Sequence, residues 1–114
     1  IRSNNSWAGN APRLAKGPDK CIALINPADA AAHGISDGDL VRITSDTGMV
    51  DAPARVTDEI MPGVVSLPHG FGHGRPGVRL RVAGARPGVS HNDLTSRARI
   101  DILSGTAALV GTPV

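Results

Sequence analysis

Two histidines four residues apart stand in the glycine-rich stretch LPHGFGHGRPG, residues 67–77. On a helix, the spacing of His69 and His73 would place two imidazoles on one face, where they could share a zinc ion. The surrounding glycines and prolines strongly disfavour a helix at this place. The other candidate ligands in the chain are His33, His91 and Cys21. Since their spacing fits no zinc motif, we predict no metal site.

Glycine also allows backbone N–H groups to converge on an anion, because no Cβ keeps the ligand away. Gly70, Gly72 and Arg75 approach the dinucleotide-binding fingerprint, but an arginine replaces its third glycine. A proline follows where the helix of a Rossmann unit should begin. Two interpretations therefore stay open: a backbone cradle for phosphate, and an ordinary structural loop.

The chain has no acidic residue between Glu59 and Asp93, an interval that contains several arginines. These are Arg75, Arg79, Arg81 and Arg86. Their guanidinium groups favour phosphate-bearing ligands, so a non-enzymatic nucleic-acid or anion-binding module using Arg75–Arg86 is an alternative. A merely solvated basic face is another. Base stacking needs aromatic platforms, and the chain contains only Trp7 and Phe71. We therefore expect no nucleic acid as a partner.

No catalytic residue is predicted. Ser66, Ser90 and Ser104 are near histidines in the sequence, but none lies in a nucleophile elbow. Carboxylates such as Asp37 and Asp46 have the surroundings of turn residues.

The elements that must position the glycine-rich loop are short. CIALI at 21–25 predicts a buried strand, and Asn26-Pro27 followed by Gly34 predicts a helix of about two turns between a cap and a stop. Residues 40–45 and 48–56 predict a hairpin, whose second arm alternates apolar and polar positions. Pro53 in that arm predicts an edge strand or a bulge, because proline removes a ladder hydrogen bond.

Further strands are expected at 61–67, at 78–83 and in the closing residues 105–114, with a possible short strand near Asn5 to Ala8. Residues 91–95 predict a turn. Many short strands with one or two small helices predict an all-β fold, a closed or nearly closed β-barrel.

The size of 11.7 kDa fits one domain over residues 1–114. The formal charge of +2 is too small to imply a nucleic acid or a membrane as partner. No segment approaches the roughly 18 consecutive apolar residues of a membrane span. Cys21, the single cysteine, predicts a buried free thiol and a cytoplasmic location. Both ends break off within a pattern, so we expect a piece of a larger polypeptide.

Several motifs together carry a family resemblance. The run INPADAAAHGISDGDLVRITSDTGMVDAPARVTDEIMPGVVSLPHGFGHG, followed by NDLT and DILSGTAAL, resembles the C-terminal molybdopterin-dinucleotide-binding domain of molybdenum oxidoreductases. Formate dehydrogenases, nitrate reductases and dimethyl sulfoxide reductase contain this domain. The opening RSNNSW is similar to the family's first cofactor-binding segment. The likeness covers essentially the whole chain.

The resemblance implies a six-stranded double-psi β-barrel that binds molybdopterin guanine dinucleotide and closes the active-site cleft of a molybdenum- or tungsten-dependent oxidoreductase. It implies an enzyme of the formate dehydrogenase or nitrate reductase type, in which this domain alone is inactive. The residues then expected to contact the cofactor are Arg2, Asn5, Ser6, Trp7, His69, Gly70, Gly72, Asn92 and Asp93. Amide and carboxylate groups match the edges of guanine or pterin, and Ser6 and Arg2 suit phosphate oxygens. We expect the opening segment and the 91–95 turn to meet as one lip over the nucleotide.

The remaining parts of such an enzyme are absent from this sequence. The metal-ligating residue and the iron–sulfur cysteines of the family belong to preceding domains, so Cys21 is assigned neither role. The expected partners are those preceding domains and an electron-transfer subunit, with no membrane. A self-processing decarboxylase shares the barrel but needs a Gly-Ser bond, and the chain contains no such dipeptide.

Overall fold

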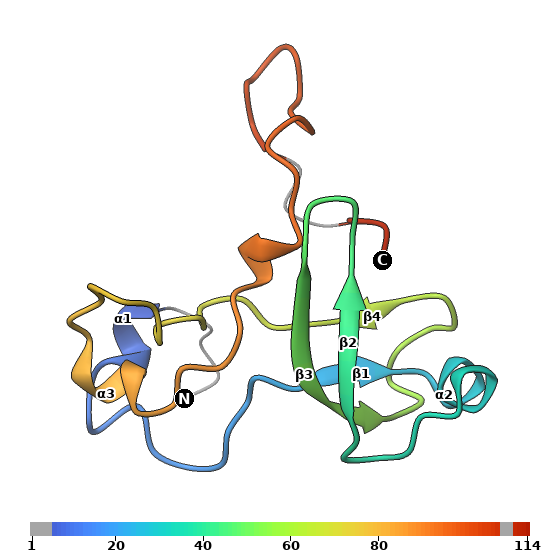
Figure 1. Cartoon of the computed structure of the whole chain (residues 1–114), viewed down its shortest axis with the longest axis horizontal. Helices are drawn as coiled ribbons and strands as arrows, with labels where there is room; N and C mark the ends of the chain where they lie inside the picture. The colour runs from blue at the N-terminus through green and yellow to red at the C-terminus, as the bar shows by residue number, and fades with distance from the viewer. Residues whose placement is uncertain (1–5, 108–110) are drawn as a thin grey trace.

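A mixed four-stranded sheet with the strand order β2-β3-β1-β4 forms one side of the molecule (Figure 1). The structure is a computed structural model that describes residues 6–107 and 111–114. The strands are β1 (Ala23–Ile25), β2 (Leu40–Thr44), β3 (Met49–Val56) and β4 (Val65–Ser66). The helices are α1 (Ser6–Gly9), α2 (Pro27–His33), α3 (Arg81–Gly84) and the 3₁₀ helix η1 (His91–Asp93). The described residues are thus mainly β, with a few short helices.

The segment from β1 to α2 follows the sequence prediction. β1 runs parallel to β3 and antiparallel to β4, so it has a paired strand on each side. The Asn26 side chain then accepts a hydrogen bond from Ala28 N at 2.9 Å, and Pro27 opens the helix. Gly34 ends it in the left-handed conformation, with φ of 65°.

The predicted hairpin is also confirmed, because β2 and β3 are antiparallel from Leu40–Pro53 to Thr44–Met49. The prediction that Pro53 marks an edge or a bulge is wrong, since β3 lies between β2 and β1. Ala54 N donates to Asp39 O at 2.7 Å, so Leu40 and Pro53 form a non-hydrogen-bonded pair. The Pro53 nitrogen therefore faces the β1 side, one residue before pairing with β1 begins at Ala54. A proline is tolerated there because the ladder needs no N–H at that position.

The sheet is open over the described residues, and the predicted closed barrel is not shown. The expected strand at 78–83 is replaced by α3, because the Asn10 side chain accepts hydrogen bonds from Val82 N and Ala83 N at the start of that helix. Ala8, in the expected opening strand, lies in α1. Residues 111–114 form no strand, and 108–110 lie outside the described residues. The sheet consequently keeps four strands.

Two regions follow from this arrangement. We call residues 21–69, which contain the sheet and α2, the sheet lobe. We call residues 6–20 and 70–94 the loop lobe, because α1, α3 and η1 are short and the rest is irregular. The two lie side by side in Figure 1, where α1 and α3 are adjacent. Nothing among the described helices is long and apolar enough to cross a membrane.

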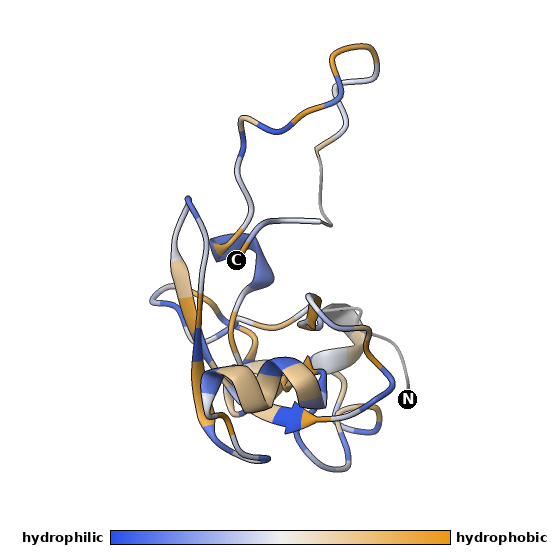
Figure 2. Ribbon diagram, turned by 90° about the vertical axis from the view of Figure 1, so that its right-hand side faces the viewer, coloured by the Kyte–Doolittle hydropathy of each residue, from blue (hydrophilic) through white to orange (hydrophobic). Residues whose placement is uncertain are grey.

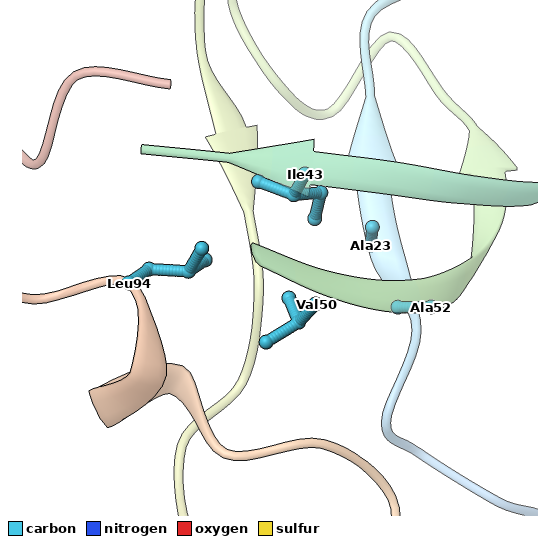
Figure 3. Packing of buried hydrophobic residues seen from close by; sticks show 5 residues of the cluster. All are labelled: Ala23, Ile43, Val50, Ala52 and Leu94. Carbon is cyan, nitrogen blue, oxygen red and sulfur yellow. The ribbon is translucent and has the colours of Figure 1, made fainter. Parts of the chain in front are cut away.

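The core lies between the hairpin and the residue after η1 (Figure 3). Its main cluster contains Ala23, Ile43, Val50, Ala52 and Leu94, with Leu94 pointing toward Val50 and Ile43. A second cluster of Ile25, Ala30 and Ala54 joins α2 to the sheet. Small residues predominate in these two clusters, so close backbone approach replaces large side chains.

Candidate functional site

A cavity of about 610 Å³ lies between the glycine-rich loop and the segment that forms η1. This volume is typical of small-molecule sites. The loop contributes Leu67, His69, Gly70, Phe71, Gly72, His73 and Arg75, and the facing segment contributes Ser90, His91 and Asn92. The cavity therefore has two walls, which are formed by segments about twenty residues apart in the sequence.

The loop is anchored to the backbone before η1. Gly72 N donates to Pro87 O at 2.6 Å. Gly72 has φ of +97°, and a Cβ there would lie 2.6 Å from Ser90 Cβ and 2.9 Å from Ser90 Cα. Gly74 similarly has Pro87 Cβ at 2.9 Å from where its own Cβ would be. The missing side chains thus serve close packing between the two walls, which is the structural interpretation that the sequence left open.

Arg75 and Asp93 form an ion pair at the edge of the cavity. The hydrogen bond to Asp93 raises the pKa of Arg75 above its ordinary value. Asp93 was predicted to face the cofactor directly, and in the structure its carboxylate holds Arg75, which lines the cavity. The pair connects the glycine-rich loop to η1 at a second place.

The Asn92 side chain forms no hydrogen bond with any residue that the structure describes, although its backbone oxygen accepts from Thr95 Oγ1 at 3.2 Å. Its amide therefore keeps both donors and acceptors for a ligand. His69 is exposed at the cavity, whereas His73 Nε2 donates to Gly70 O at 3.1 Å within the loop. Gly70 itself has φ of 92°, a conformation that favours glycine.

The electrostatic character differs sharply between the two lobes. The loop lobe contains seven lysines and arginines against two aspartates, while the sheet lobe contains two arginines against seven acidic residues. The cavity lies on the basic side, since most of its lining belongs to the loop lobe. An anionic ligand is favoured there over a cationic one.

Four of the nine predicted residues line this cavity: His69, Gly70, Gly72 and Asn92. Arg2 and Asn5 lie outside the described residues, and of Ser6 and Trp7 only the backbone, in α1, is described. A smaller cavity of about 100 Å³ joins the end of α1 to the loop, being lined by Ala8, Gly9, Gly70, Phe71 and His73 among others. The end of α1 and Asn92 thus flank the same loop from two cavities. The meeting of the opening segment and the 91–95 turn as one lip stays a prediction.

Sequence reasoning missed several lining residues: Phe71, His73, Arg75, Ser90 and His91. Arg75 had a signal, because it stands in the basic interval next to the loop. Ser90 had none, since its role depends on contact with Gly72 across the fold. No group of three or more His, Cys, Asp or Glu side chains within residues 6–107 and 111–114 could hold a metal ion.

The thiol of Cys21 is buried beside this lobe and is free. Val89 N donates to Cys21 Sγ at 3.3 Å, and a Cβ on Gly88 would lie 2.8 Å from the sulfur. Burial raises the pKa of this thiol above its ordinary value, and nearby Asp19 adds to the effect, while the Val89 hydrogen bond opposes it. An inert packing role follows, as the sequence predicted.

Comparison with protein families identifies the cofactor class of the domain. The family model described as the Molydopterin dinucleotide binding domain matches residues 1–113. The chain belongs to this family. Molybdopterin dinucleotide is accordingly the cofactor of the domain, and the basic cavity with its unpaired amide fits a phosphate-bearing ligand of this kind.

Individual relatives of this molybdopterin-dinucleotide-binding domain are much longer proteins. The arsenate respiratory reductase molybdopterin-containing subunit of Shewanella sp. (strain ANA-3) is 40% identical over 79% of the chain and 11% of its own length. One subunit of the tetrathionate reductase of Salmonella typhimurium is 29% identical over 99% of the chain and 13% of its length. The dimethyl sulfoxide/trimethylamine N-oxide reductase of Cereibacter sphaeroides is 51% identical over 41% of the chain and 6% of its length.

The chain therefore spans about a tenth of the length of the relatives it matches. They are reductases, as the resemblance to dimethyl sulfoxide reductase implied. They do not specifically indicate a formate dehydrogenase or a nitrate reductase.

Proposed function

We propose that this domain binds the guanosine diphosphate part of a molybdopterin guanine dinucleotide and covers the active-site cleft of a molybdenum- or tungsten-dependent oxidoreductase. The observation that carries the proposal is the 610 Å³ cavity, which is lined by Asn92 and by a loop that the Arg75–Asp93 ion pair ties to η1. An amide offers a donor and an acceptor to a purine edge, and the basic lobe favours the pyrophosphate. When bound, the cofactor supplies metal-centred redox chemistry, while these residues supply binding and orientation.

The relatives' names favour a reductase that acts on a sulfoxide, an N-oxide, arsenate or tetrathionate. The formate dehydrogenase or nitrate reductase type remains a prediction from sequence resemblance. We also propose that the open sheet becomes part of a double-psi β-barrel in the full enzyme, and that preceding domains of the same polypeptide hold the metal and an iron–sulfur cluster. A cytoplasmic location and an electron-transfer subunit belong to the same proposal.

The test is the substitution Asn92→Ala in the full-length enzyme. We expect the purified variant to contain several-fold less molybdenum and less releasable guanine nucleotide, because the cofactor loses an amide contact. Its thermal unfolding should be unchanged, since the Asn92 side chain supports no other described residue.

Thr44→Ala is a matched control, because Thr44 is an exposed polar residue of β2 that does not line the cavity. Its cofactor content should equal that of the parent enzyme. Unchanged molybdenum in Asn92→Ala would contradict the assignment of this cavity. Salt-sensitive binding of generic DNA or RNA by the parent protein would support the nucleic-acid alternative instead.

A further inference from the structure

Residues 97–107 project from the body of the molecule as an arm that contacts neither lobe beyond its base. The arm is drawn in orange and red in Figure 1, where it extends away from the sheet and from η1. The radius of gyration of 15.0 Å exceeds the roughly 13 Å expected for a compact chain of this length, which agrees with a projecting segment.

The tip of the arm has an ordered turn. Asp101 N donates to Thr106 O at 2.9 Å, Gly105 N donates to Asp101 O at 2.8 Å, and Ile100 and Ala107 form an antiparallel bridge. The Asp101 carboxylate accepts from both the backbone N–H and the hydroxyl of Ser104, at 2.7 and 2.8 Å. These hydrogen bonds hold the pKa of Asp101 below its ordinary value. The turn is thus held by hydrogen bonds within the arm itself.

This ordered turn presents two large aliphatic side chains to solvent. Leu103 is 98% exposed and Ile102 is 93% exposed, and Figure 2 shows the hydrophobic colour at the end of the projecting segment. Full exposure of two adjacent aliphatic residues is unfavourable, since burying each would contribute about 1.5–3 kcal/mol.

We infer that the Ile102–Leu103 tip inserts into an apolar pocket on another part of the same polypeptide and so fastens this domain over the cofactor cleft. The inference rests on the proposed function, in which the domain is one part of a larger enzyme. The relatives that the chain matches have about nine tenths of their length outside the matched region, which provides ample surface for the pocket.

The small apolar area of the tip favours a pocket on the same polypeptide over a pocket on a separate protein. Two aliphatic side chains supply far less than the roughly 800 Å² per partner of a stable interface between separate proteins. A contact that small holds when both surfaces belong to one chain, because the effective local concentration is then high. The Arg99 guanidinium lies 3.8 Å from the Asp46 carboxylate, so the base of the arm lies beside the turn between β2 and β3.

The test measures alkylation of a cysteine at the tip in the full-length enzyme, quantified by peptide mass spectrometry. We expect Leu103→Cys to react at least about ten-fold more slowly in the native enzyme than in urea, as a buried thiol does. A rate in the native enzyme equal to the unfolded rate would refute the inference. Protection that vanishes on dilution would also refute it, because it would show a second copy as the occupant.

A second measurement covers the case in which the cysteine itself disturbs docking. Ile102→Ser combined with Leu103→Ser should make the native enzyme cleavable by trypsin after Arg97 and Arg99, several-fold faster than the parent. Leu40→Ser is the matched control, because Leu40 is a 72% exposed leucine outside the arm. Equal cleavage of the double variant and the control would count against docking.

Molybdenum and guanine nucleotide are measured in the same preparations. Cofactor present with an unprotected arm refutes the docking inference and leaves the proposed function standing. An absent cofactor in the parent enzyme refutes the proposed function itself.

Discussion

The sheet lobe and the loop lobe are stabilised by different kinds of contact. In the sheet lobe, strands pair through regular backbone ladders, and β2 and β3 form a hairpin with five residue pairs in register. In the loop lobe, single hydrogen bonds join groups that are about fifteen to seventy residues apart, such as Gly72 N to Pro87 O and Val82 N to the Asn10 side chain. The first region depends on strand pairing that starts from a local hairpin, and the second on close approach of distant segments.

The charge divides along the same line. Several acidic side chains of the sheet lobe accept hydrogen bonds from backbone N–H groups: Asp37 accepts from Val56 N at 2.8 Å and Asp39 from Ser36 N at 2.7 Å. Among the arginines of the loop lobe, Arg75 lines the cavity. The sheet lobe thus serves as a scaffold held by its own strand pairing. The loop lobe is a binding region that depends on that scaffold. Substitutions outside the core that the two lobes share should therefore have separable effects.

Gly72→Ala should have the largest effect on the loop lobe. The new Cβ would stand 2.6 Å from Ser90 Cβ at a backbone φ of +97°, so strain and overlap together should cost about 3 kcal/mol. Urea unfolding monitored by circular dichroism measures this loss. Gly77→Ala is the control, because Gly77 has a φ of +87° but nothing within 4 Å of its Cβ position, and about 1 kcal/mol is expected. Equal losses would show that packing against Ser90 does not matter.

Ile43→Ala should destabilise the sheet lobe almost as strongly. Ile43 is buried in the main core cluster beside Val50 and Leu94, so a cavity costing about 2–3 kcal/mol is expected. The same unfolding measurement checks it. Because Leu94 connects this core to η1, cofactor content should also fall. A stability loss with full cofactor retention would show that the lobes are more independent than their shared core indicates.

Asn26→Ala should have a smaller and purely local effect. The substitution removes the cap of α2 and the hydrogen bond from Asn26 Nδ2 to Ile60 O at 2.6 Å, for a loss of about 1 kcal/mol. Cofactor content in the full enzyme should not change, since α2 is remote from the cavity lining. Reduced cofactor binding by this variant would contradict the division into scaffold and binding region.

The smallest predicted effect is a change in acid sensitivity. Arg42 donates two hydrogen bonds to Asp51, which lower the pKa of this carboxyl below its ordinary value of 3.8. The group therefore contributes stability above its unfolded pKa, and that contribution is lost as the pH falls through the lowered folded value. Asp51→Asn should flatten the decline of the urea midpoint between about pH 5 and pH 2. An unchanged decline would show that the pair contributes nothing measurable.

The sequence was most informative where neighbours in the chain are neighbours in space. The cap at Asn26, the stop at Gly34 and the alternation of Val50, Ala52 and Ala54 are local signals, and each predicted its element. It was least informative where a distant group decides the conformation. Residues 78–83 alternate as a strand would, yet residues 81–84 form α3, where the Asn10 side chain accepts from Val82 N and Ala83 N. Pro53 suggested an edge, but its position relative to Asp39 and β1 made a central place acceptable.

The same reasoning identified only part of the candidate site. The glycines, His69 and Asn92 were identified by residue type and by family resemblance, whereas Ser90 and the ion pair of Asp93 with Arg75 were not. A glycine pattern specifies that backbone approaches something closely. It does not specify whether the neighbour is a ligand or another part of the chain.

The sequence by itself determined the family, the cofactor class, the hairpin and the helix after β1, because these depend on residue order and on contacts over a few residues. Only the tertiary structure decided the strand order, the packing of Gly72 on Ser90, the pairing of Asp93 with Arg75 and the exposure of the arm. Those features depend on distances between segments that are far apart in the chain, and no local pattern encodes such distances.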